Sequence, residues 1–404
     1  MTKPLRIGLL MQGGQGWIGG SEYIKNIILA LGSLPEGDRE SFEVYLFASD
    51  TLNQSFVEEV TPHLKKIFYS GISLDPYTSE ESLIAPAKLS ARILSKLQKQ
   101  VFNSKNLNLD RVLRQHGIDF VYPYFVAAQT SYKRAAWIYD FQHKHLTDLF
   151  TKEEIVKRDD SFSRMAHHSS TVVLSSKTAQ SDFQTFFPVA AHRSKVLSFK
   201  TSPQAIWYDL NPVEVQRKYC LPDRFFIVSN QFWQHKNHVV IFQALKQLQE
   251  RSLYPIVVCT GHIHDYRKPD YADTILQMIH SAGIAHQVYL LGLIPKLDQI
   301  QLLRRAIAVI QPSLFEGWNT TVEDARLLGK PIVLSNILVH LEQNPPHSYF
   351  FDSTSSEHLA DVLAETWASL PLCPNLAQET LAKTQGITEI QTFAKTFLDI
   401  GRTA

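Results

Sequence analysis

Short apolar stretches alternate with longer segments of helical periodicity along the whole chain. In the first half, the predicted strands cover residues 5–11, 42–48, 119–122, 134–138, 171–174 and 196–199. In the second half, they cover residues 225–229, 256–260, 288–291, 308–310 and 332–334. Helical patterns lie between them, for example at residues 21–34, 238–250 and 297–304. This alternation predicts an α/β fold with parallel, doubly wound sheets.

A proline-containing segment interrupts the alternation and predicts a boundary between two domains. Residues 201–222 include Pro203, Pro212 and Pro222 and break the strand–helix rhythm. The chain has 404 residues, more than one ordinary core requires. We therefore expect two Rossmann-like domains, over residues 1–205 and 206–385, facing each other across a cleft. A final helix within residues 386–404 can pack back on the first domain.

Composition and charge exclude some classes of function but do not identify one. The chain is 44% hydrophobic and 20% charged, as in soluble globular proteins, and its net charge of +1 attracts no nucleic acid. Cys220, Cys259 and Cys373 are scattered, which fits neither a disulfide framework nor a zinc site. No signal peptide is evident, and no apolar run reaches the ~18 residues that span a bilayer. We expect a cytoplasmic protein.

Residues 88–102 form a basic amphipathic pattern. The segment has four basic residues and no acidic residue, and aliphatic residues recur at positions 89, 93, 97 and 101. Such a helix can lie on an anionic membrane, or it can pack on the first domain with its basic face in water. The first alternative predicts peripheral contact with the inner face of a membrane, close to a lipid-linked acceptor.

The segment EGWNTTVEDA, residues 316–325, carries the strongest chemical signal. Glu316 and Asp324 lie eight positions apart, across a loop and the start of a predicted helix. Thr320 and Glu323 have the spacing of a capping box, which predicts Thr320 as the N-cap. A helix N-terminus favours a phosphate, so one carboxylate can face a sugar and the other a ribose. This pattern predicts a glycosyltransferase with a nucleotide-sugar donor. Alternatively, Glu323 and Asp324 only favour the helix dipole.

Taken together, these features resemble the retaining glycosyltransferases of family 4, in glycosyl transferases group 1, which have the GT-B fold. The hallmark of that family is two glutamates with seven residues between them, and here these positions hold Glu316 and Asp324. The resemblance implies that Glu316 contacts the donor sugar and that Asp324 binds the ribose. Because aspartate is shorter by one methylene, Glu323 stays an alternative for the ribose. The intervening residues expected at the donor are Gly317, Trp318, Asn319 and Thr320.

A second match to the family lies in the loop after the predicted strand 225–229. Family members usually carry an arginine and then a lysine in this loop, and both contact the donor diphosphate. Lys236 matches the lysine, whereas Gln231 stands near the position of the arginine. The resemblance implies a catalytic contact between Lys236 and the leaving diphosphate, whose developing charge needs stabilisation. Asn230 and Gln231 are expected to line the donor site.

Loops at three predicted strand ends complete the expected site. Glycine allows backbone to approach a ligand closely, and the resemblance implies that Gly19 and Gly20 line the cleft near the donor phosphate. It also implies a histidine near the donor sugar, for which His143 is the first choice and His145 the second. This histidine-rich loop can alternatively bind a metal, although no third ligand follows at zinc spacing. Gly261 is expected to turn the chain at the edge of the cleft.

The resemblance implies retention of anomeric configuration, with no metal or other cofactor. We expect a hexose to move from a GDP- or UDP-linked donor to a glycan, lipid-linked or small-molecule acceptor, as in polysaccharide biosynthesis. Positioning and electrostatics would provide most of the catalysis. Two alternatives stay open: a nucleotide-sugar epimerase, and a non-catalytic nucleotide- or glycan-binding scaffold of the same fold. The missing arginine and the substitution at Asp324 favour the scaffold.

Overall fold

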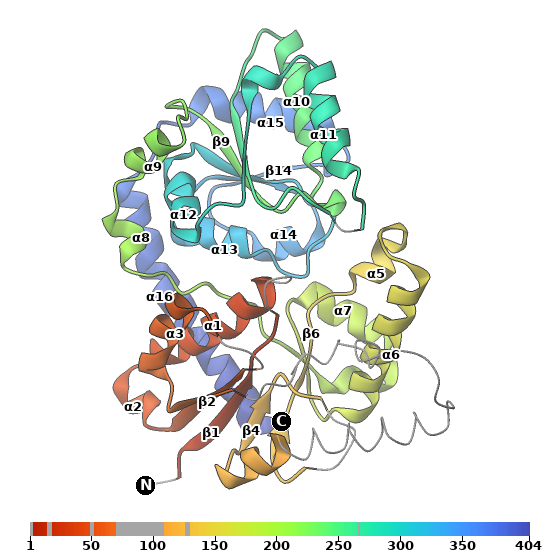
Figure 1. Ribbon diagram of the computed structural model, residues 1–404, viewed down its shortest axis with the longest axis vertical. Helices are drawn as coiled ribbons and strands as arrows, with labels where there is room; N and C mark the ends of the chain where they lie inside the picture. The colour runs from red at the N-terminus through yellow and green to blue at the C-terminus, as the bar shows by residue number, and fades with distance from the viewer. Residues whose placement is uncertain (1–2, 14–17, 49–51, 70–108, 126–129, 266) are drawn as a thin grey trace, which may run out of the picture.

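The protein consists of two α/β domains arranged along its longest axis (Figure 1). The structure is a computed structural model, and it describes residues 3–13, 18–48, 52–69, 109–125, 130–265 and 267–404. The predicted amphipathic segment 88–102 lies outside the described residues. Among the helices that are described, none combines the length and the apolar character that crossing a bilayer requires.

The first domain contains two parallel sheets. The five-stranded sheet has the order β3-β2-β1-β4-β5. Its strands are β1 (Leu5–Leu10), β2 (Phe42–Ala48), β3 (Lys66–Tyr69), β4 (Phe120–Tyr122) and β5 (Lys133–Arg134). The three-stranded sheet consists of β6 (Ala136–Ile138), β7 (Val172–Leu174) and β8 (Ser194–Val196). The single strand predicted over residues 134–138 is therefore wrong, because the chain passes from one sheet to the other at Ala135.

Helices of the first domain follow from capping residues and apolar faces. Those with both ends in the described ranges are α1 (Ile18–Gly32), α2 (Glu36–Arg39), α3 (Gln54–Val60), α5 (Gln142–His145), α6 (Lys152–His168) and α7 (Lys177–Phe186), and residues 109–115 are also helical. Helix α6 begins with a capping box, in which Thr151 and Glu154 exchange side-chain-to-backbone hydrogen bonds. Its buried face carries Phe162 and Met165, which join the apolar cluster around β6 and β7.

The second domain contains one six-stranded parallel sheet in the order β11-β10-β9-β12-β13-β14. Its strands are β9 (Phe226–Ser229), β10 (Val257–Thr260), β11 (Val288–Gly292), β12 (Ala308–Gln311), β13 (Ile332–Ser335) and β14 (Ser348–Phe351). The strands β9, β10, β12 and β13 are buried throughout and mainly apolar, as expected where helices cover both faces of a parallel sheet. The direction of winding reverses between β9 and β12. In open α/β sheets, ligands bind at the carboxyl ends of strands beside such a switch point.

Helices cover the two faces of this sheet and build separate apolar clusters. They are α8 (Ile206–Asp209), α9 (Pro212–Lys218), α10 (His238–Glu250), α11 (Tyr271–Ser281), α12 (Lys296–Arg305), α13 (Thr320–Leu327), α14 (Leu338–Gln343) and α15 (Ser356–Ser369). Helices α8 and α9 lie within the predicted linker 201–222 and pack against α12. Most of that segment is therefore part of the second domain.

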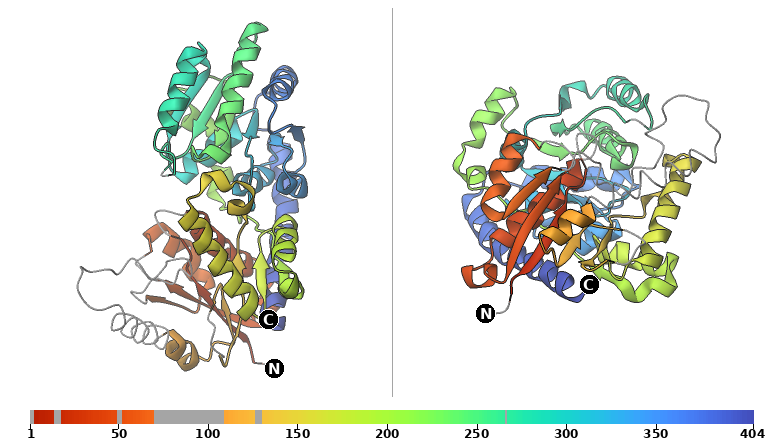
Figure 2. Two further views of the ribbon diagram at one scale, coloured as in Figure 1. Left: turned by 90° about the vertical axis from the view of Figure 1, so that its right-hand side faces the viewer. Right: turned by 60° about the horizontal axis from the view of Figure 1, so that its bottom comes forward.

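Helix α16 (Leu376–Thr403) connects the two domains and begins earlier than the predicted terminal helix. At its start, Glu379 forms a buried ion pair with Arg304 of the second domain. Further along, Phe397 packs among the aromatic rings of Phe120 and Tyr122 in the first domain. Figures 1 and 2 show this helix in blue, running from one domain to the other. The core of the first domain therefore includes residues from the end of the chain.

Candidate functional site

Glu316 and Lys236 form an ion pair at the switch point of the second sheet. Lys236 lies in the loop after β9, and Glu316 lies in the loop after the neighbouring strand β12. The Nζ atom of Lys236 is 2.6 Å from Oε1 of Glu316. Only 16% of the lysine side chain and 8% of the glutamate side chain are exposed. The fold thus brings together the two residues that the sequence most strongly assigns to the donor.

The Glu316 carboxylate is held by further donors from its own loop. The Ser313 hydroxyl donates to Oε1 at 2.6 Å, and the Asn319 side-chain amide donates to the same oxygen at 3.3 Å. Within the described part of the chain, all hydrogen bonds to this carboxylate reach Oε1. The second oxygen, Oε2, has no hydrogen-bond partner among these residues.

Asn319 is the N-cap of α13, and the prediction of Thr320 as the N-cap is wrong. The Oδ1 atom of Asn319 accepts a hydrogen bond from the Val322 backbone N–H at 3.2 Å. Its backbone is extended, as an N-cap requires, whereas Thr320 is already the first helical residue and is exposed. The expected partner Glu323 does not return to the helix start, because its carboxylate contacts Lys200 and Gln343.

His340 of α14 contacts Asn319 from the other side, and sequence reasoning did not identify it. Its Nε2 atom lies 3.2 Å from the Asn319 amide nitrogen, and its Nδ1 atom lies 3.1 Å from the Ser335 carbonyl oxygen. Because an amide nitrogen only donates, Nε2 accepts, and the ring proton resides on Nδ1. Burial lowers the pKa of His340 to about 4, although the nearby Glu316 carboxylate acts in the opposite direction. The imidazole is therefore neutral at pH 7.

Asp324 and Glu323 face different surroundings although they are adjacent. Asp324 contacts the ammonium group of Lys296, which begins α12 after the β11 loop. Glu323 contacts Lys200 at 3.1 Å and the Gln343 amide at 2.9 Å, so its carboxylate is already bound. Both carboxylates are almost completely buried. Of the two, Asp324 lies beside a strand-end loop of the second sheet, where a nucleotide is expected to bind.

Asn230 and Gly261 meet where β9 and β10 end. Gly261 has a φ angle of 134°, and a Cβ atom there would lie 2.0 Å from the Asn230 carbonyl oxygen. Only glycine fits this close approach. The Asn230 side-chain nitrogen is buried and has no hydrogen-bond partner among the described residues. Gln231 is half-buried, and its carbonyl oxygen accepts from the Trp233 backbone.

His143 is completely buried in the first domain. Its Nε2 atom is 3.0 Å from Oδ1 of Asp159, and its ring packs at 5.4 Å from the ring of Phe162. Burial lowers the pKa of His143 to about 4. Aromatic rings therefore enclose the imidazole, and its contact with a donor sugar stays a prediction. His145, the second choice, lies 5.4 Å from the ring of Phe315 and is partly exposed.

The loop that carries Glu316 also contacts the first domain. A Cβ atom at Gly317 would lie 2.5 Å from the Tyr139 carbonyl oxygen, and the Trp318 indole donates to the Phe199 carbonyl oxygen at 2.9 Å. Asp140 lies at the same junction. Burial raises the pKa of the Asp140 carboxyl group, and the Glu316 carboxylate acts in the same direction. The expected donor site therefore lies at the boundary between the two domains.

Gly19 and Gly20 lie in the first turn of α1, where Gly19 is exposed and Gly20 is buried. Residues 14–17 of the glycine-rich loop are outside the described part of the chain.

Across the described ranges, no group of three or more histidine, cysteine, aspartate or glutamate side chains could hold a metal ion.

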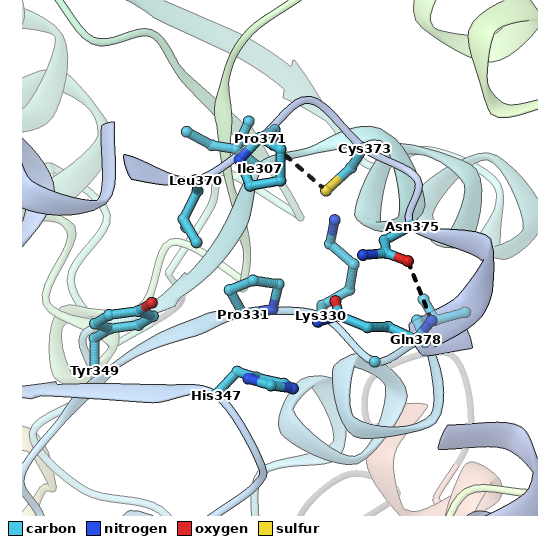
Figure 3. A pocket seen from close by; sticks show the side chains of 12 residues that line it. Ile307, Lys330, Pro331, His347, Tyr349, Leu370, Pro371, Cys373, Asn375 and Gln378 are labelled. Carbon is cyan, nitrogen blue, oxygen red and sulfur yellow. Dashed lines mark hydrogen bonds between the residues drawn. The ribbon is translucent and has the colours of Figure 1, made fainter. Parts of the chain in front are cut away.

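A separate pocket lies at the opposite end of the second sheet (Figure 3). Ile307, Pro331 and His347 line it, and each directly precedes a strand. Lys330 extends from this region and donates to the carbonyl oxygen of Arg304 at 3.3 Å, at the end of α12. The pocket therefore belongs to the amino ends of the strands, away from Glu316.

Residues 217–380 match a family model described as Glycosyl transferases group 1. The matched region covers most of the second domain and includes Lys236, Glu316 and Asp324. A comparison with curated proteins finds no match.

Three solved structures illustrate the fold. A glycosyltransferase from Rickettsia africae is 14% identical, with 100% of this chain and 99% of that chain covered and a TM-score of 0.66. Anabaena HepE in complex with UDP-glucose is 17% identical, with 98% and 100% covered and a TM-score of 0.62. Sucrose-phosphate synthase from Thermosynechococcus elongatus is 12% identical, with 99% and 98% covered and a TM-score of 0.64. The predicted GT-B architecture is confirmed.

Proposed function

We propose that this chain, whose second domain is a glycosyl transferases group 1 domain, transfers a hexose with retention from a nucleotide-diphosphate sugar to an acceptor hydroxyl. The observation that carries the proposal is the buried pair of Lys236 and Glu316 at the switch point. A buried cation suits a leaving diphosphate, and a carboxylate whose Oε2 has no hydrogen-bond partner among the described residues suits a sugar hydroxyl.

The two residues have different parts in this proposal. Lys236 neutralises the charge that develops on the diphosphate as the glycosidic bond breaks, together with the partial positive charge at the N-terminus of α13. Glu316 accepts a hydrogen bond from the hexose through Oε2, while Oε1 stays bound to Ser313 and Asn319. Asp324 binds the ribose, with Lys296 beside it. No protein nucleophile is required, because positioning and electrostatic stabilisation carry the reaction.

UDP-glucose is the first donor to test, with GDP-linked sugars as the alternative. HepE has been solved with UDP and glucose and with UDP-glucose. These structures support UDP-glucose as the probe for this chain. We propose a glycan, lipid-linked or small-molecule acceptor and a reaction without metal, so that EDTA should leave turnover unchanged.

The experiment is thermal unfolding with UDP, GDP and UDP-glucose for the wild type and for Lys236→Ala and Glu316→Ala. A nucleotide at 100 times its dissociation constant should stabilise the wild type by about 2.7 kcal/mol. Lys236→Ala should lose most of the response to the diphosphate. Glu316→Ala should keep the response to UDP and lose the additional response to UDP-glucose.

Lys218→Ala is the matched control, because Lys218 also forms a 2.6 Å ion pair, with Asp298, but on the outer surface. It should respond to nucleotides like the wild type. If no nucleotide stabilises the wild type, the proposed donor site is wrong.

A non-catalytic scaffold is the second candidate, because Gln231 occupies the position where an arginine is expected. Nucleotide binding without release of UDP from UDP-glucose, across a panel of acceptors, would favour the scaffold. Formation of sugar isomers without an acceptor would favour an epimerase. Residues 88–102 are predicted to contact a membrane, and the protein would then act in the cytoplasm at the inner face of that membrane. Liposome sedimentation can test this contact.

A further inference from the structure

Helix α14 contacts the first domain through Glu342. The carboxylate of Glu342 accepts hydrogen bonds from the backbone N–H groups of Lys177 at 2.8 Å and Thr178 at 3.1 Å. It also accepts from the Thr178 hydroxyl at 3.2 Å. These N–H groups belong to the first turn of α7, where they have no partner within the helix, and a carboxylate there is favoured. Glu342 of the second domain therefore caps a helix of the first.

The same short helix holds Asn319 through two other side chains. The Gln343 amide accepts from the Asn319 backbone N–H at 3.3 Å and donates to the Asn319 carbonyl oxygen at 3.0 Å. His340 of α14 and Gln311 of β12 accept from the Asn319 side-chain amide at 3.2 Å and 3.0 Å, and the same amide lies 3.3 Å from Glu316. The orientation of that amide is fixed, because its oxygen caps α13. One helix thus contacts both the backbone and the side chain of Asn319.

We propose that α14 positions Glu316, with His340 acting through Asn319, and that this depends on the contact of Glu342 with α7. A helix of six residues is not stable alone, and Ile337 at its start provides no side-chain cap. The order of α14 must therefore come from its contacts on both sides. Losing the contact with the first domain loosens the hold on Asn319 as well.

In this arrangement, the contact between the two domains at Glu342 and the alignment of the Glu316 carboxylate are coupled. When Glu342 leaves α7, the hold of α14 on Asn319 weakens, and the hydrogen bond from Asn319 to Glu316 weakens with it, while the donors from Ser313 and Lys236 stay in place. The significance of Glu316 rests on the proposed function, whereas the coupling itself can be measured without any substrate.

Hydrogen exchange of backbone amides in the full-length protein tests the coupling. Glu342→Ala should accelerate exchange at Lys177 and Thr178 and also, by about tenfold, in the segment 319–322, since a lost buried hydrogen bond changes opening equilibria on that scale. Asp361→Ala is the control, because it removes an exposed 2.5 Å contact with Arg251 that involves neither α13 nor α14. It should leave 319–322 unchanged. Acceleration confined to α7 and α14 in Glu342→Ala would overturn the proposal.

Two variants of His340 test its positioning role separately. A glutamine can offer its carbonyl oxygen near the position of Nε2. An asparagine is too short to reach that position and can replace only the contact that Nδ1 makes. With UDP-glucose as the probe, His340→Asn should lower kcat for UDP release about tenfold and leave KM within about twofold. His340→Gln should recover most of kcat.

Equal loss of kcat in both variants, or a change in KM alone, would refute positioning through Nε2. If the wild type releases no UDP from UDP-glucose, the proposed function fails, and hydrogen exchange alone decides the coupling. The two failures are therefore distinguishable.

Discussion

The buried ion pair between Arg304 and Glu379 anchors the start of α16 to the second domain. The guanidinium binds the carboxylate in a bidentate manner, with two N–O distances of 2.9 Å. It also donates to the carbonyl oxygens of Trp207 at 3.0 Å and Leu210 at 2.7 Å. Only 2% of the Arg304 side chain and 5% of the Glu379 side chain are exposed. Arg304→Met would leave the Glu379 carboxylate and the Leu210 carbonyl oxygen without this donor, whereas the Trp207 carbonyl oxygen would keep the Gln301 side-chain amide at 3.0 Å.

The magnitude follows from this burial. Removing one partner of a buried ion pair costs about 3–5 kcal/mol, because the remaining charge is uncompensated. Replacing both partners by apolar side chains is often neutral, so Arg304→Met with Glu379→Leu should recover much of the loss. The exposed pair Arg251–Asp361 is the matched control, with 40% and 61% of its side chains exposed. Arg251→Ala should cost about 0.2–1 kcal/mol.

Urea unfolding followed by circular dichroism measures these differences in the free energy of unfolding. The double variant and the two single variants form a double-mutant cycle, which isolates the energy of the pair. The reasoning would be refuted by a cost below about 1 kcal/mol for Arg304→Met. It would also be refuted if the double variant were as unstable as the single variant.

Two further predictions concern the site and its surroundings. Gly261→Ala should destabilise the protein by about 1–3 kcal/mol and weaken its stabilisation by UDP, since a Cβ atom collides with the Asn230 carbonyl oxygen. Thermal unfolding with and without UDP measures both effects. An unchanged response to UDP would separate Gly261 from the donor site. Burial lowers the pKa of His143 from its ordinary 6.5 to about 4, so the unfolded chain binds a proton more readily between these values. The contribution of His143 to the free energy of unfolding is therefore fully present above about pH 6.5. It decreases as the pH falls toward 4, by up to about 1.4 kcal/mol per pH unit. His143→Phe should lose less stability than the wild type between pH 7 and pH 5.5 in urea unfolding, and equal losses would contradict the assignment to His143.

Most strands of both domains could be predicted because buried parallel strands are apolar on both faces. Strand β9 illustrates this, since Phe226–Ser229 is buried throughout. The strands that were missed lie at the edges of their sheets. Strand β3 (Lys66–Tyr69) is exposed at both ends, and most of β14 (Ser348–Phe351) is only half-buried, so neither produces a continuous apolar signal.

The candidate site was predicted in its residue types but not in its contacts. Asn319 and Thr320 can both cap a helix, and the choice between them depends on tertiary contacts from α14. His340 gives no signal in sequence, because its function depends on where the fold places a six-residue helix. His143 stands in a histidine-rich loop, but the sequence does not reveal that aromatic side chains enclose it. Local patterns identify loops with chemistry, whereas the partners of each side chain come from distant segments.

The path of α16 affects the order in which the protein can be completed during synthesis. The first domain precedes the second on the ribosome, yet its core includes Ile390 and Phe397. A nascent first domain therefore exposes the apolar surface around Phe120 while the second domain is made and can complete its own sheet. The first domain is synthesised first, but its core is completed last, when α16 has been made. Until then the exposed apolar surface favours aggregation or chaperone binding.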